Sequence, residues 1–157
     1  MSTSGPPDLR IEYLSPHAVK LDPHNPRRHT DLQIAQIARS VQTFGFNVPV
    51  VIDGTNTVRA GHGRVLAARK MALQGIPVIR LIHLTEAQAR AFGIADNKLT
   101  DNSSWDDQLL GEVFRDLTMV DLDFTLEATG FSMGEIDLRI EGLSTTATIE
   151  AEPAEDR

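Results

Sequence analysis

The sequence VRAGHGRVLAARK, residues 58–70, joins a strand-like run to a helix-like run through a glycine turn. Residues 57–60 have the composition of a short strand, and an alanine-rich pattern predicts a helix from about Arg64 to Gln74, ended by Gly75. Because a helix N-terminus presents unpaired N–H groups and a partial positive charge, such a turn can bind an anion. From the residues alone, the turn could bind a phosphate, bind a metal ion or bind nothing.

The turn itself is Gly61-His62-Gly63-Arg64. The two glycines permit a close approach and a positive φ, and the forked guanidinium of Arg64 suits phosphate oxygens. The turn matches neither G-x-x-x-x-G-K-[ST] nor G-x-G-x-x-G, so a plain structural turn is the alternative. His62 could donate to a phosphate, act as a base or point into solvent, and we favour the phosphate contact.

Two other stretches carry groups of the same chemistry. NPRRH, residues 25–29, places two arginines on a proline-constrained loop, and ADNKLTDN, residues 95–102, supplies an acid, amides and a lysine at the end of a predicted helix. Arginines can neutralise phosphate oxygens, while a carboxylate and an amide carbonyl can hold Mg²⁺. The alternatives are a solvated loop for the arginines and a helix C-cap for Asp96 and Asn97.

A zinc site is compatible with the composition but not with the spacing. Its ligands would be His24, His29, His62 and Asp96. No H-x-x-x-H pair on a helix supports it.

Periodicity and capping residues predict the remaining elements. They are an edge strand in 11–21 broken near Pro16, a helix capped by Thr30 and Gln33 and ended by Gly45, a hairpin over 48–60, a strand in 76–82, a helix from Thr85 through Asp96, a helix beginning near Asp106, and a short helix capped by Ser132 and Glu135. This order predicts an α+β domain with packed helices, followed by an acidic helical extension.

Charge divides along the chain of 157 residues. Residues 1–100 hold 12 Lys/Arg and 7 Asp/Glu, whereas residues 101–157 hold 3 and 15. This asymmetry predicts a basic working surface followed by an acidic module, or an acidic part that serves only solubility. The absence of cysteine excludes a disulfide scaffold and a thiol nucleophile. No apolar run suits a membrane span and the N-terminus lacks a secretion signal, so we expect a cytoplasmic protein.

The motifs HNPRRH, FGF, PVVID, AGHGRVLAARK, IPVIRL and LTEAQARAFGIADNKLTDNSSWD, in this order, resemble the N-terminal domain of ParB-type proteins. The resemblance covers about residues 10–110 and implies the ParB/sulfiredoxin-like fold with a small mixed sheet. It is closest to ParB-like domains that precede DNA methyltransferases in phage-like and mobile-element proteins. The implied domains are a mobile N-terminus at 1–9, the ParB-like domain at 10–104, the acidic helical extension at 105–142 and a disordered tail at 143–157.

Partition ParB proteins bind CTP with Mg²⁺ through an N-P-R segment, a G-E-R-R turn and an E-N segment. The resemblance therefore implies a nucleotide site made of Asn25, Arg27, Arg28, Gly61, His62, Gly63, Arg64, Asn97 and Lys98, with Asp96 and Asn97 as Mg²⁺ ligands. His62-Gly63 replaces Glu-Arg and Asp96 replaces Glu, which leaves the preferred base and hydrolysis open. Sulfiredoxin chemistry is excluded because His62 stands at that family's cysteine position.

The favoured function is a nucleotide-binding module, of CTP type, that acts in DNA modification or segregation. Its expected partners are a nucleoside triphosphate and DNA, reached directly or through a methyltransferase, and a homodimer is left open. One alternative is an enzyme on the same scaffold, a weak CTPase, a nuclease or a kinase-like phosphotransferase, with His62 and Asp96 as candidate catalytic residues. The other is an interaction domain whose turn is empty.

Overall fold

A computed structural model describes residues 5–150, with side chains from 5 to 144. The chain folds as two compact units, residues 1–103 and 104–157, which are described separately. Residues 1–4 of the stretch predicted to be mobile, and residues 151–157 of the predicted tail, lie outside the described residues.

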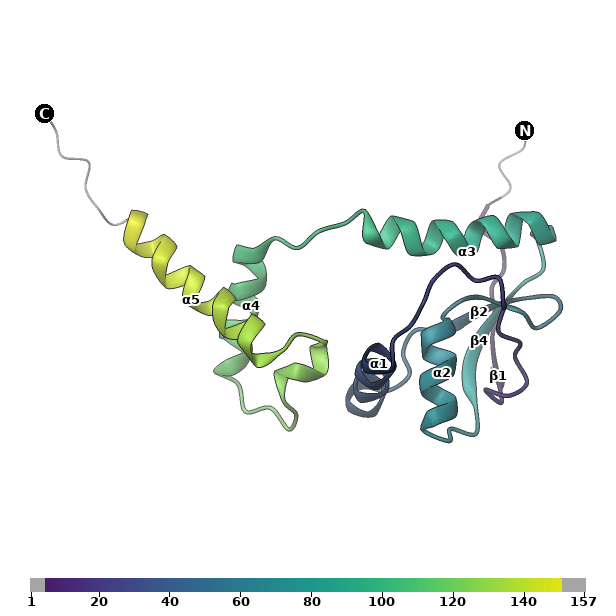
Figure 1. Cartoon of the computed structure of the whole chain (residues 1–157), viewed down its shortest axis with the longest axis horizontal. Helices are drawn as coiled ribbons and strands as arrows, with labels where there is room; N and C mark the ends of the chain where they lie inside the picture. The colour runs from purple at the N-terminus through teal and green to yellow at the C-terminus, as the bar shows by residue number, and fades with distance from the viewer. Residues whose placement is uncertain (1–4, 151–157) are drawn as a thin grey trace, which may run out of the picture. The chain divides into compact units, whose positions relative to one another are not determined.

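The first unit is built on a four-stranded mixed sheet in the order β1-β4-β2-β3. Figure 1 labels β1, β2 and β4 of this sheet. The strands are β1 (Ile11–Leu14), β2 (Val50–Asp53), β3 (Val58–Ala60) and β4 (Ile76–Leu81). β1 pairs antiparallel with β4, β4 parallel with β2, and β2 antiparallel with β3. The predicted edge strand and hairpin are both present, and the α+β class is confirmed.

The helices of this unit are α1 (Asp31–Phe44), α2 (His62–Lys70) and α3 (Glu86–Asp101). Thr30 caps α1 by accepting from the N–H of Gln33, and Thr85 and Gln88 form a complete capping box on α3. Three predicted boundaries were wrong. α2 begins two residues before Arg64 and ends at Lys70, and α3 continues past Asp96 to Asp101.

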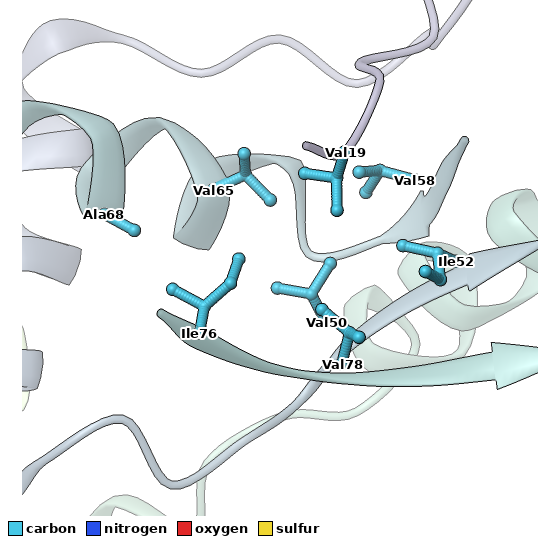
Figure 2. Close-up of a cluster of buried hydrophobic side chains, with 8 residues drawn as sticks. All are labelled: Val19, Val50, Ile52, Val58, Val65, Ala68, Ile76 and Val78. Atoms are coloured by element: carbon cyan, nitrogen blue, oxygen red, sulfur yellow. The ribbon is translucent and has the colours of Figure 1, made fainter. Parts of the chain in front are cut away.

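The core of the unit lies between α2 and the sheet. Figure 2 shows Val65 and Ala68 of α2 facing valines and isoleucines of the strands. The buried cluster is Val19, Val50, Ile52, Val58, Val65, Ala68, Ile76 and Val78. Each fully buried valine or isoleucine stabilises the fold by about 1.5–3 kcal/mol. This packing fixes the start of α2 against the end of β3.

The second unit contains α4 (Asp107–Thr118), a 3₁₀ turn η1 (Leu126–Thr129) and α5 (Met133–Glu150). Phe114, Leu126 and Ile136 form its buried core. Asp106 caps α4, and Ser132 with Glu135 caps α5 as predicted. The last helix is 18 residues long rather than short, so residues 143–150, predicted to be a disordered tail, are helical. Within residues 5–150, no helix has the length and apolarity needed to cross a membrane.

Candidate functional site

The glycine turn opens onto a cleft of about 230 Å³ in the first unit. Three segments distant in sequence line it, namely the loop before α1, the β3–α2 turn and the last turns of α3, and Gln33 and Ile37 of α1 complete the lining. Of the predicted site residues, the cleft contains Asn25, Arg27, Gly61, His62, Gly63, Arg64, Asp96 and Asn97. Arg28 and Lys98 do not line it, and both are exposed.

The turn depends on two glycines for different reasons. Gly61 is the N-cap of α2 with φ +99°, a left-handed conformation that disfavours other residues. At Gly63, a Cβ would lie 2.8 Å from Cδ1 of Ile37 and 3.1 Å from the ring of His29. Gly61, the N-cap residue, provides no side-chain cap. The N–H groups of the first turn of α2, which borders the cleft, therefore have no capping acceptor.

Arg64 is half-buried and contacts the backbone as well as the cleft. Its Nη2 donates to the carbonyl oxygen of Pro49 at 3.1 Å, and its Nε is buried without a partner among the described residues. Burial lowers the pKa of Arg64, and the charge of Asp96 opposes that shift. The guanidinium therefore keeps hydrogen-bonding capacity that the described protein groups do not use.

His62 lies in the same cleft with a lowered pKa. Burial is the main cause, the charges of His29 and Arg59 act in the same direction, and the carboxylate of Asp22 opposes them. Its Nε2 atom is buried without a partner within the described part of the chain. The lowered pKa favours a neutral imidazole near pH 7, which has one N–H donor and one acceptor.

The loop and α3 supply the remaining polar groups. Nη1 of Arg27 pairs with the carboxylate of Asp101 at 2.9 Å, and the N–H of Arg27 donates to Oδ1 of Asn25 at 3.2 Å. Nδ2 of Asn97 donates to the carbonyl of Gly93 at 3.0 Å, so this side chain is held inside α3 with its own oxygen still able to accept. The C-cap of α3 is Asn102, so the helix-cap interpretation of Asp96 and Asn97 was wrong.

Sequence reasoning missed a buried ion pair beside the cleft. Asp53 and Arg59 are each 8% exposed, and Nη2 of Arg59 lies 2.7 Å from Oδ2 of Asp53. A second carboxylate, from Asp22, lies 3.2 Å from Nη1 of Arg59. The available signal was a charged residue inside the apolar run VRA, which is unusual for a buried strand unless the charge is paired.

A polar hollow of about 440 Å³ borders Asp22 and Arg59. Arg59 and Asp22 line it together with Lys20, His24 and Arg90. A smaller pocket shares Asp22 and Arg59 with the hollow, and Asn25 and His62 with the cleft. Within residues 5–144, no three His, Asp or Glu side chains gather as a metal-binding group, and this includes the zinc set that the composition allowed but the spacing did not support.

The chain is similar to known proteins in sequence and in fold. No family model matches the chain. Over 78 residues, half of this chain, the sequence is 42% identical to the ParB-like nuclease domain-containing protein YnaK of Escherichia coli (strain K12), of which 84% is covered.

Two solved structures have a similar fold. One is the C-terminally truncated chromosome-partitioning protein ParB of Caulobacter crescentus complexed with CTP-gamma-S, with a TM-score of 0.70, 17% identity, and coverage of 86% of this chain and 79% of that one. The other is a Pnob8-like ParB-N domain, with a TM-score of 0.50, 13% identity, and coverage of 94% of this chain and 51% of that one.

Proposed function

The chain belongs to the family of ParB-like domains, and from this we propose that it is a nucleotide-binding module. Its ligand would be a nucleoside triphosphate of CTP type, bound with Mg²⁺ in the cleft at the start of α2. The module would act in DNA modification or segregation.

The observation that carries this proposal is the meeting of three segments in one cleft. The loop before α1 contributes Arg27, the turn contributes Gly61–Arg64, and α3 contributes Asp96 and Asn97. These stretches lie far apart in sequence, and each holds groups that suit part of a metal–triphosphate complex. A plain structural turn would not require the other two segments to supply such groups.

Different groups of the chain would contact different parts of the triphosphate. The free N–H groups of the first turn of α2 would donate to phosphate oxygens, and Gly61 gives that turn the positive φ with which it begins. Arg27 lines the cleft with a partly exposed side chain and would neutralise a phosphate after giving up its partner Asp101. His62 would donate one hydrogen bond from its buried ring.

The donor set on α3 fits Mg²⁺. Mg²⁺ in nucleotide sites is usually held by one or two carboxylates, the phosphates and several waters. Asp96 is exposed at the cleft and can supply the carboxylate, and Asn97 can supply an amide oxygen. When bound, the ion would neutralise phosphate charge beside Asp96, which otherwise repels the ligand.

The named ligand of the Caulobacter ParB structure supports a CTP-type nucleotide. At 17% identity the likeness concerns the fold, and His62-Gly63 replaces the Glu-Arg of the ParB turn. The hollow beside Asp22 and Arg59 offers room for a ribose and base next to the phosphate cleft.

Isothermal titration of the purified chain with CTP, ATP and GTP, with and without Mg²⁺, tests the proposal. We expect saturable binding of one triphosphate that weakens when Mg²⁺ is removed. Arg27→Ala should weaken that binding about tenfold, as expected for the loss of one charge-assisted contact, while Arg28→Ala should leave it within about twofold. Equal effects of the two variants, or no binding at millimolar ligand, would overturn the triphosphate cleft.

The same preparation tests the DNA setting. Gel-shift measurements at several salt concentrations, with and without the bound nucleotide, would detect direct DNA contact through its salt dependence. Capture of a methyltransferase would indicate an indirect route. Incubation with plasmid and Mg²⁺ tests the nuclease in the relative's name, which the proposal does not require.

A further inference from the structure

Arg59 joins two carboxylates from different segments of the first unit. Its Nε and Nη2 atoms donate to Oδ2 of Asp53 at 2.9 and 2.7 Å, and its Nη1 donates to Oδ2 of Asp22 at 3.2 Å. The guanidinium is buried, and its planar fork can make these bonds in two directions at once.

The Asp53 end of this bridge is firmly held. Oδ1 of Asp53 accepts from the N–H groups of Thr55 and Thr57 at 2.8 and 3.0 Å and from the hydroxyl of Thr55 at 2.7 Å. The β2–β3 turn therefore fixes Asp53, and Asp53 fixes Arg59. Gly93 of α3 also packs here, because a Cβ on it would lie 2.6 Å from the carbonyl oxygen of Arg59.

The Asp22 end lies at the start of the cleft loop. The chain just before it is held beside β3, since Lys20 donates to the carbonyl of Asn56 and accepts from the N–H of Val58. Asp22 then begins a turn in which its Oδ1 accepts from the N–H of His24 and its carbonyl accepts from the N–H of Asn25. We call the ion pair between Arg59 and Asp22 the tie. Because it holds the start of the loop, it affects the position of the residues that follow.

We propose that Arg59 is a positioning residue for the cleft: anchored on Asp53, it holds Asp22 and so sets Asn25 and Arg27 against the glycine turn. This inference rests on the proposed function for the identity of the ligand. The tie itself, between Arg59 and the loop, does not depend on any ligand.

Two variants break the tie without leaving an unpaired charge at its buried end. Asp22→Ala removes the outer carboxylate while Asp53 still pairs with Arg59. Arg59→Lys keeps the charge, but an ammonium lacks the planar fork that reaches both carboxylates. Glu12→Ala is the matched control, because Glu12 pairs with Arg80 at the same distance, 3.2 Å, between β1 and β4.

Two measurements on the full chain separate the tie from the function. Hydrogen exchange of peptides covering residues 22–29, without nucleotide, reports the position of the loop. We expect exchange there to be about tenfold faster in Asp22→Ala and Arg59→Lys, as for the loss of one charge-assisted hydrogen bond, and unchanged in Glu12→Ala. Titration with triphosphate and Mg²⁺ should show about tenfold weaker binding in the first two variants only.

Each outcome decides the inference. Unchanged exchange in residues 22–29 of Asp22→Ala would overturn the tie, whatever the titration gives. Faster exchange with wild-type affinity would overturn the positioning role, because a purely structural ion pair changes stability and not affinity. If the wild-type chain binds no triphosphate, the proposed function and the role in ligand binding fail together, while faster exchange in both Asp22→Ala and Arg59→Lys would still establish the tie. Faster exchange in Asp22→Ala alone would overturn it, because that variant also removes the acceptor of the His24 N–H.

Discussion

At the scale of single residues, Asp53 shows how burial and hydrogen bonding compete for one charge. Burial alone would raise the pKa of its carboxyl, but hydrogen bonds from Thr55, Thr57 and Arg59 outweigh burial and lower the pKa to about 2. Because the folded pKa lies below the unfolded value of 3.8, the ionised carboxylate stabilises the fold above about pH 4. That contribution, about 2 kcal/mol, is lost as the pH falls from about 4 through 2.

Asp53→Asn removes this pH-dependent term. At pH 7 we expect the variant to have a lower free energy of unfolding than the wild type by about 2–4 kcal/mol, because Arg59 loses the more buried of its two carboxylate partners. The difference should narrow as the pH falls toward 2, where about half of the wild-type carboxyl groups are also protonated. Urea unfolding followed by far-UV circular dichroism at pH 7, 4, 3 and 2 measures it. A difference that stays constant down to pH 2 would contradict the lowered pKa.

Gly63 is predicted to be required by packing rather than by backbone conformation. In Gly63→Ala, the new methyl group would press on Ile37 and His29, so we expect the free energy of unfolding to fall by about 1–3 kcal/mol. Gly54→Ala is the control, since a Cβ there meets no atom within 4 Å, and it should change the same quantity by less than about 0.5 kcal/mol. Equal changes in the two variants would show that the close packing of Ile37 and His29 on Gly63 does not govern stability.

At the scale of helices and strands, local chemistry predicted beginnings better than ends. At Thr30, Thr85 and Ser132, the side-chain oxygen accepts from the N–H three residues later and so caps a helix. Such a cap involves only neighbouring residues, and it can therefore be recognised in the sequence. The end of α3 was placed five residues early, because the polar run ADNKLTDN looks like a cap while its Asn97 bonds back to Gly93 within the helix. Polar residues can continue a helix when their hydrogen bonds are satisfied inside it.

In the cleft, too, local features could be predicted from the sequence and long-range contacts could not. The residues of the turn were readable because glycines, a histidine and an arginine carry local signals. The Asp22–Arg59–Asp53 bridge was not readable, since which acid pairs with a buried arginine depends on the sheet register and on the path of the loop. The exclusion of Arg28 and Lys98 from the cleft likewise depends on which way a loop and a helix face turn in three dimensions.

Two glycines in the second unit should respond to alanine with opposite signs. A Cβ at Gly111 of α4 would lie 2.7 Å from the carbonyl oxygen of Arg139 in α5, so Gly111→Ala should lower the free energy of unfolding by about 1–3 kcal/mol. A Cβ at Gly142 of α5 meets nothing within 4 Å, so Gly142→Ala should raise it by about 0.5–1 kcal/mol through helix propensity.

The single tryptophan of the chain makes this comparison measurable. Trp105 packs edge-to-face on Phe131, with ring centroids 5.5 Å apart, inside the second unit. Urea unfolding followed by its fluorescence therefore reports on α4 and α5. Destabilisation by both substitutions, or by neither, would contradict the close approach of the two helices at Gly111.

At the scale of the whole molecule, the described part of the chain has two buried cores that share no residue. One is built on the sheet around Val65, and the other gathers Phe114, Leu126 and Ile136 between α4, η1 and α5. The cleft and every predicted site residue belong to the first unit. Two separate cores allow two separate unfolding transitions, because each unit can lose its own buried apolar surface.

Ile136→Ala tests whether the cores are independent. Ile136 is fully buried, so its truncation should lower the stability of the second unit by about 2–5 kcal/mol. We expect the Trp105 fluorescence transition to move to lower urea, while hydrogen exchange of the strands and of α2 keeps its wild-type rates. Val65→Ala, the reciprocal variant in the other core, should accelerate exchange in the strands and leave the fluorescence transition in place. If either variant shifts both signals together, the two cores unfold as one cooperative unit, and a cleft in the first unit would then depend on packing in the second.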